Sequence, residues 1–301
     1  MMRALLAALL LLPSAGGFAA SGGRNVFDFL ALDVGGKPLA MGGAFTGLAD
    51  DINAMFYNPA GLGGIGDVQA TLFYRKWLAQ TGYSYAAVAG PVAGLGSFGG
   101  SLLQAGGPPI DSYDAEGNPN GTINPRGTVV ALSWGRAVLP GVLAGATVKY
   151  AEEELAVSRS TAVLADLSVL ADITGKIRAG FLVGNVGMAQ GGSAPLTMRG
   201  GVSVSLLDRR LQGVAEATVA GRDDPQVMAG AEYRVVEPLA LRAGYMMEMG
   251  GRDLGGMTGL TAGVGFRFGS ISLDYAFTPL GELGNAHLIG VTYRAKGEVL
   301  R

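Results

Sequence analysis

Residues that could carry out chemistry are few in this chain, and their spacing fits none of the common catalytic or cofactor sites. The run Gly94-Leu-Gly-Ser-Phe-Gly99 has the glycine spacing of a dinucleotide-binding loop. Such a loop must open a helix, whereas the residues that follow are typical of a strand. His287 is the only histidine and cysteine is absent, which excludes histidine clusters and thiolate metal sites. We predict no catalytic residue, no metal site, no cofactor and no enzymatic activity.

Two groups of acidic residues remain. Asp111, Asp114 and Glu116 lie in a segment rich in Gly, Pro and Asn, where they either bind a cation or simply face water. Asp50 and Asp51 follow an apolar stretch, and a charge in poorly hydrated surroundings needs a partner. We therefore expect arginines to pair with them. The net charge of −2 excludes the basic surface of a nucleic-acid-binding protein.

The elements that hold these residues are predicted by hydrophobicity. Hydrophobic residues make up 49% of the chain and charged residues 15%, a balance unlike that of soluble proteins. After the N-terminus, no apolar run reaches the roughly 18 residues of a spanning helix. A closed β-barrel is the other way to pair every backbone group inside lipid. The composition therefore favours a transmembrane antiparallel β-barrel.

From residue 67 onward the chain alternates apolar and polar side chains, the pattern of strands with two different faces. We count about fourteen such runs, and an even number is typical of bacterial barrels. The face rich in small and charged side chains would line the lumen, with Arg242, Arg267 and Asp274 among its polar residues. The predicted strands are 67–76, 82–90, 94–105, 126–137, 141–152, 161–173, 176–187, 196–207, 211–220, 225–235, 238–249, 256–268, 270–278 and 285–294.

The predicted connections alternate between short turns and longer loops. Short turns include Pro91–Ala93, Val138–Pro140 and Asp208–Arg210, and the longest loop spans 106–125. In bacterial barrels the short turns face the periplasm and the longer loops face the outside. We therefore predict that the protein lies in the bacterial outer membrane, surrounded by its lipid.

The N-terminus differs from the rest of the chain. Arg3, a short apolar run and small residues at Gly17 and Ala19 predict a signal peptide over residues 1–19. Residues 20–66 do not alternate, and Pro38 to Asp51 has the pattern of a short helix. A barrel of this size has an interior too wide for its own side chains to fill. We therefore predict that residues 20–66 form a plug, or hatch, inside a barrel of residues 67–301.

The segment Gly36 to Asp51, followed by Ala54 to Leu62, resembles the N-terminal signature of the PorV/PorQ family, which belongs with the FadL-type outer-membrane transporters. The resemblance implies a fourteen-stranded barrel with a partly helical N-terminal hatch. Residues that match the family pattern would either gate the lumen or only pack the hatch. They are Gly42, Gly43, Asp50, Asp51, Asn58, Pro59, Ala60 and Gly61.

The resemblance leaves two functions open. The first is passage of hydrophobic small molecules such as fatty acids, with an apolar pocket near the hatch at Met41, Phe45 and Met55. The second is a role in type IX secretion, with secretion-system proteins as partners. A porin-like protein without dedicated cargo is a third possibility. The predicted loops are modest in length, which leaves little surface for a large protein cargo.

Overall fold

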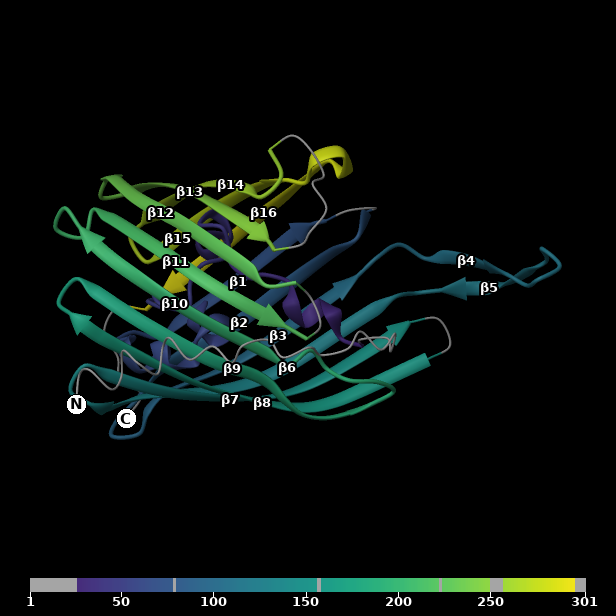
Figure 1. The fold of residues 1–301 in the computed structure, drawn as a ribbon, viewed down its shortest axis with the longest axis horizontal. Coiled ribbons are helices and arrows are strands. Elements are labelled where there is room, and N and C mark those ends of the chain that lie inside the picture. The colour runs from purple at the N-terminus through teal and green to yellow at the C-terminus, as the bar shows by residue number, and fades with distance from the viewer. Residues whose placement is uncertain (1–25, 78–79, 156–157, 222–223, 250–256, 296–301) are drawn as a thin grey trace.

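Fourteen strands form a closed antiparallel barrel in the computed structural model, which describes residues 26–77, 80–155, 158–221, 224–249 and 257–295 (Figure 1). Around the barrel the order is β1-β16-β15-β14-β13-β12-β11-β10-β9-β8-β7-β6-β3-β2. This confirms the predicted all-β barrel. The barrel strands are β1 (Gln69–Lys76), β2 (Gly82–Val92), β3 (Gly96–Gly106), β6 (Arg126–Leu139), β7 (Val142–Leu155), β8 (Ser158–Thr174), β9 (Ile177–Gln190), β10 (Thr197–Leu206), β11 (Leu211–Ala220), β12 (Gln226–Val236), β13 (Leu239–Glu248), β14 (Leu260–Phe268), β15 (Ile271–Pro279) and β16 (Asn285–Arg294). The predicted signal peptide lies outside the described residues.

The two faces of the wall follow from the alternation in the sequence. In β1, Leu72 and Tyr74 are 60% and 57% exposed on the outside, whereas Phe73 and Arg75 are buried on the inside. The same holds for the other strands, and their outward aliphatic side chains form an apolar band. The tyrosines on this outer face include Tyr150, Tyr245, Tyr275 and Tyr293, all of which are exposed.

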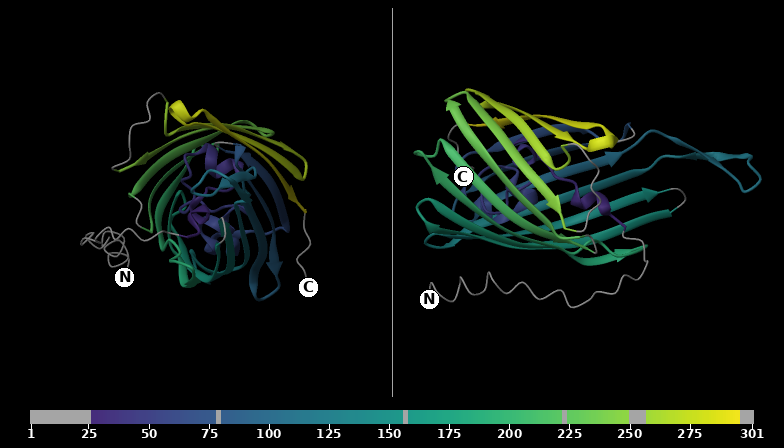
Figure 2. Two further views of the ribbon diagram at one scale, coloured as in Figure 1. Left: turned by 90° about the vertical axis from the view of Figure 1, so that its right-hand side faces the viewer. Right: turned by 45° about the horizontal axis from the view of Figure 1, so that its top comes forward.

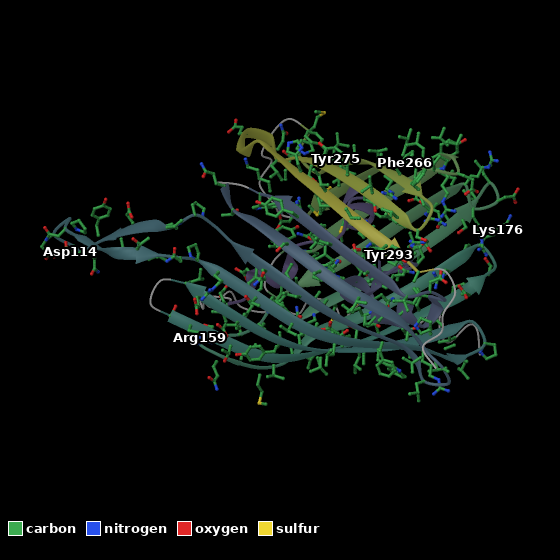
Figure 3. All side chains as sticks on the ribbon, turned by 180° about the vertical axis from the view of Figure 1, so that it is seen from behind. Asp114, Arg159, Lys176, Phe266, Tyr275 and Tyr293 are labelled. Carbon is green, nitrogen blue, oxygen red and sulfur yellow. The ribbon has the colours of Figure 1, made fainter. Side chains whose placement is uncertain are left out.

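Short turns gather at one end of the barrel and longer loops at the other. Figure 3 shows this division, with Lys176 at the short-turn end and Asp114 and Arg159 at the long-loop end. The long loop contains a feature that the alternation did not predict. Its strands β4 (Ile110–Tyr113) and β5 (Pro119–Ile123) form a hairpin that projects beyond the barrel (Figures 1 and 2).

The N-terminal segment runs through the interior of the barrel, as the end-on view in Figure 2 shows. Every residue from Val34 to Ala49 is buried. Its helices are short: η1 (Asp28–Ala31), α2 (Gly36–Ala40), α3 (Ala54–Tyr57) and η2 (Pro59–Gly64), with η4 (Gly281–Leu283) in a later loop. None of the helices among the described residues is long and apolar enough to cross a bilayer.

The predicted helix from Pro38 to Asp51 is wrong in extent. The helix α2 ends at Ala40, because Gly42 and Gly43 adopt φ angles of 76° and 84°, a left-handed conformation that stops a right-handed helix. The glycine-rich stretch that follows, Pro59 to Gly64, forms η2. Asn58 caps this helix by accepting a hydrogen bond from the Ala60 amide.

Candidate functional site

The inner wall carries glycines where the N-terminal segment touches it. A Cβ atom at Gly145 would lie 2.1 Å from the Ala60 nitrogen, and one at Gly180 would lie 2.1 Å from the Thr46 oxygen. Such distances leave no room for any side chain. We call this surface the glycine seat. It comprises Gly135, Gly145, Gly180, Gly201, Gly230, Gly244 and Gly263, on strands β6, β7, β9, β10, β12, β13 and β14.

The sequence Asn58-Pro59-Ala60 lies against β6, β7 and β8. Asn58 is fully buried, and its amide nitrogen donates to the carbonyl oxygens of Thr46 at 2.8 Å and Val169 at 3.1 Å. The Ala60 amide also donates to the Ser168 hydroxyl at 3.0 Å. Asn58 thus connects two turns of the segment to the wall. Gly61 packs against its own segment, because a Cβ atom there would lie 2.1 Å from the Ala49 oxygen.

The other signature residues also make packing contacts. Gly42 faces the backbones of Ala229 and Tyr245, and Gly43 faces the Asp33 carboxylate. Asp50 pairs with Lys37 at 2.7 Å. The expected arginine partner of Asp50 is therefore replaced by a lysine of the same segment.

Asp51 is also hydrogen-bonded within the N-terminal segment. It accepts hydrogen bonds from the backbone and side-chain nitrogens of Asn53. Burial raises the pKa of Asp51 above its ordinary value, and the charge of Lys37 opposes the rise. For Lys37 burial favours the neutral form, but the charges of Asp50, Glu232 and Asp51 outweigh it and raise the pKa.

Glu216 of β11 is the main charged contact between wall and segment. Its carboxylate accepts hydrogen bonds from the backbone amides of Phe45 at 2.8 Å and Thr46 at 2.7 Å. Arg199 donates to the same carboxylate at 3.3 Å and lies 3.9 Å from Asp33. Burial raises the pKa of Asp33, while the guanidinium of Arg199 opposes the rise. These groups form a buried network that fixes the middle of the segment.

A second charged cluster lies on β12 to β15, where we expected lumenal polar residues. Arg242 donates to Glu232 at 2.7 Å and also binds Asp274. Glu232 lies directly opposite Arg242 on the neighbouring strand β12, whereas Asp274 reaches the arginine from β15, across β14. Arg267 also faces the lumen, but it lies nearer the short-turn end and is exposed. All three residues lie at inward-facing positions of their strands, and the sequence did not indicate which of them pair.

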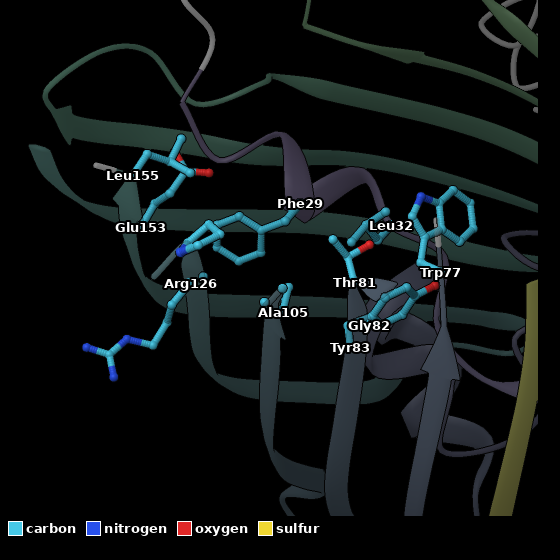
Figure 4. A pocket seen from close by; sticks show the side chains of 14 residues that line it. Phe29, Leu32, Trp77, Thr81, Gly82, Tyr83, Ala105, Arg126, Glu153 and Leu155 are labelled. Atoms are coloured by element: carbon cyan, nitrogen blue, oxygen red, sulfur yellow. The ribbon is translucent and has the colours of Figure 1, made fainter. Parts of the chain in front are cut away.

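An apolar cleft of about 200 Å³ opens at the long-loop end, beside the start of the N-terminal segment (Figure 4). Phe29 and Leu32 of the segment form one side of the cleft, and Trp77, Tyr83 and Ala105 of the wall form the other (Figure 4). The remaining lining comes from residues near the ends of β2, β3, β6 and β7: Thr81, Gly82, Gly106, Gly107, Pro125, Arg126, Gly127, Glu153 and Leu155.

The residues that we predicted for an apolar pocket do not line this cleft. Met41 and Phe45 have no exposed surface and Met55 has 2%. Met55 packs against the position of Gly99, and Met41 lies on Gly230. The aromatic lining at Phe29 and Trp77 was missed, because neither residue lies in the signature segment and their proximity depends on the closed barrel.

Charge is distributed unequally between the two ends. At the short-turn end, the described basic residues outnumber the acidic ones, and at the long-loop end the reverse holds. Short-turn residues are Arg136, Lys176, Arg178, Arg209, Arg210, Arg234, Arg267 and Arg294 against Asp67, Asp172, Asp208 and Glu237. Long-loop residues are Asp28, Asp111, Asp114, Glu116, Glu152, Glu153, Glu154, Asp224, Glu248 and Glu282 against Lys76, Arg126 and Arg159.

The described residues include no cluster of acidic and histidine side chains that would hold a metal ion. Asp114 of the hairpin turn instead accepts hydrogen bonds from the backbone amides of Glu116 and Asn118. These bonds lower the pKa of this exposed carboxyl group, with the Asn118 amide as the largest cause. Of the two alternatives left open for this loop, turn geometry accounts for Asp114 without a bound cation.

No family model and no curated protein matches the sequence. Solved structures do match the fold. The toluene transporter TbuX of Ralstonia pickettii has a TM-score of 0.66 at 15% identity, covering 89% of this chain and 100% of that chain. The toluene transporter TodX of Pseudomonas putida has a TM-score of 0.63 at 15% identity, with 90% and 99% covered. A FadL homologue of Pseudomonas aeruginosa has a TM-score of 0.59 at 14% identity, with 90% and 99% covered.

These likenesses extend over nearly the whole described barrel, and they concern the fold. The resemblance to the PorV/PorQ family stays a prediction from the sequence. Together with the closed wall and its apolar outer face, the likenesses make the chain a bacterial outer-membrane β-barrel of the FadL and TodX type of fold.

Proposed function

We propose that this protein passes small apolar molecules across the outer membrane and carries out no enzymatic step. The observation that carries the proposal is the apolar cleft between the outer end of the N-terminal segment and the barrel wall. A water-filled pore would instead need an open polar lumen, and here the segment fills the interior. Structural neighbours named as toluene transporters support the same substrate class.

In this proposal the N-terminal segment acts as a hatch. A ligand would enter from the long-loop end, displace water from the cleft and contact Phe29 and Trp77. The part of the N-terminal segment that packs on the glycine seat would have to shift before the ligand could pass further. The signature residues Asn58 and Gly42 would then resist that shift through their contacts with the wall. Their gating role belongs to the proposal, because their packing role explains the same contacts.

Tryptophan fluorescence can test ligand binding directly. Of the two tryptophans in the chain, Trp77 lines the cleft and Trp134 faces outward on β6. In a Trp134→Phe protein the fluorescence therefore reports on the cleft alone. We expect saturable quenching or a spectral shift when toluene or dodecanoate is titrated into the detergent-solubilised protein.

Uptake tests the transport step. Ala105→Trp should fill the cleft and reduce uptake of radiolabelled toluene or dodecanoate by cells that produce the protein. Ala146→Trp adds the same bulk to β7 on the face away from the lumen and should leave uptake unchanged. Equal uptake by both variants, or no response of Trp77 to either probe, would contradict the proposal. Recovery of cargo proteins with a type IX secretion signal, without any ligand response, would favour the alternative function.

A further inference from the structure

Two arginines at the short-turn mouth of the lumen form no ion pair with any described residue. Arg267 of β14 is exposed and forms no ion pair or side-chain hydrogen bond within the described part of the chain. Arg294 of β16 donates its backbone amide to Ser270, but its Nε atom is buried and has no hydrogen-bond partner. A buried donor without a partner is unfavourable, so Arg294 has a free donor that a further acceptor would satisfy.

The nearby carboxylates are already engaged. Glu232 and Asp274 both bind Arg242, Asp50 binds Lys37, and Asp51 accepts from Asn53. Arg234 lies 3.5 Å from the other oxygen of Glu232. Within the described residues, none of these carboxylates forms an ion pair with Arg267 or Arg294. The charges of Glu232 and Asp274 act on Arg267, and that of Asp51 acts on Arg294, only at longer range.

The barrel register brings both side chains to one place. Arg267 lies opposite Ser272 of β15, and Ser272 lies opposite Thr292 of β16. Arg294 is two residues beyond Thr292, on the same inward face. Positions two strands apart are about 10 Å from each other, which two long arginine side chains can bridge around one small anion. The positive charges of Arg294 and Arg234 also act on Arg267.

The plug leaves this mouth accessible from the short-turn end. Gly36 packs on Asp274, and both Arg267 and Arg294 are nearer the turns than Asp274. We propose that Arg267 and Arg294 form a binding site for an oxyanion, a phosphate or carboxylate group, at the periplasmic mouth. Guanidinium groups bind such anions through paired, charge-assisted hydrogen bonds. This proposal does not depend on the apolar cleft or on the proposed transport.

Inorganic phosphate is the probe for this site. In maltoside micelles at constant ionic strength, we expect the ³¹P signal of phosphate to broaden saturably in the presence of the full-length protein. The double substitution R267Q and R294Q should weaken binding by roughly tenfold or more, since two charge-assisted bonding groups are lost. The double substitution R267K and R294K keeps the charge without the paired geometry and should give an intermediate affinity.

The control is the double substitution R209Q and R210Q, in the β10–β11 turn of the same end. It removes the same charge and should leave the phosphate affinity unchanged. Equal losses in the control and in R267Q/R294Q, or no phosphate binding by the unmodified protein, would overturn the proposal. Added phosphatidylglycerol identifies the source of the anion. If the lipid competes with phosphate, the anion is a lipid headgroup; if it does not compete, the anion is a free oxyanion. Both results are compatible with the site.

Discussion

The N-terminal segment meets the barrel in two different ways. From Gly36 to Leu62 its backbone lies directly on the glycine seat, and nearly every residue is buried. From Phe27 to Leu32 it touches the wall through a few side chains and borders the apolar cleft. The first contact has no free volume, whereas the second leaves about 200 Å³ open.

This difference predicts which part of the N-terminal segment is freer to move. Close-packed backbone contacts without side chains cannot adjust to a small displacement, because any shift creates overlap or loses contact. The cleft end is joined to the wall more loosely, although the Phe27 amide donates to Glu153 at 3.0 Å. We therefore expect mutations in the seat to change stability and mutations at the cleft to change ligand affinity.

The largest effect is expected at the seat itself. In Gly145→Val the new side chain would overlap the backbone of Ala60, so the segment could not pack against the wall. We expect a loss of more than about 3 kcal/mol in the free energy of unfolding. Urea unfolding followed by gel mobility measures this loss. Gly200→Ala is the control, because its Cβ would meet its nearest neighbour at 3.7 Å. Similar stability of both variants would show that the seat is not close-packed.

Removal of the buried carboxylate should have the next largest effect. Glu216→Ala leaves the Phe45 and Thr46 amides and the Arg199 guanidinium without their acceptor, at a cost of about 3 kcal/mol. Glu216→Gln retains an oxygen acceptor and should lose less. Limited proteolysis between residues 36 and 64 would report whether the segment is released. Resistance to cleavage in both variants would contradict this role of Glu216.

A smaller loss is expected at Asn58. Asn58→Ala removes hydrogen bonds to Thr46, Val169 and Ala60 and should cost about 1–3 kcal/mol. Asn118→Ala, in the exposed hairpin, serves as the control. If the Asn58 variant were as stable as the control, the signature would have to be explained by gating and not by packing.

The smallest change in stability is expected at the cleft. Phe29 is only partly buried, so Phe29→Ala should lower the free energy of unfolding by about 1 kcal/mol. Its affinity for toluene or dodecanoate, measured through Trp77 fluorescence, should fall more clearly. A variant with unchanged affinity but strongly reduced stability would reverse the comparison between the two regions.

Much of the barrel wall could be predicted because the alternation of apolar and polar side chains is visible within each strand's own sequence. All fourteen barrel strands follow the alternation of the sequence, and Arg242, Arg267 and Asp274 lie on the predicted lumenal face. The hairpin β4–β5 was missed, since its strands are short and rich in turn-forming residues. The N-terminal helix was predicted too long, because the conformations of Gly42 and Gly43 are set by contacts with β12 and β13.

The sequence by itself determined the barrel, because a period of two and the alternation of turns and loops fix which face of each strand meets lipid. It also marked the N-terminal segment by the absence of that period. Only the tertiary structure decided which of the 51 glycines form the seat, which charges pair, and where the cleft and the unpaired arginines lie. Some of these contacts join residues more than a hundred positions apart, such as Phe45 with Glu216, and they exist only once the barrel has closed.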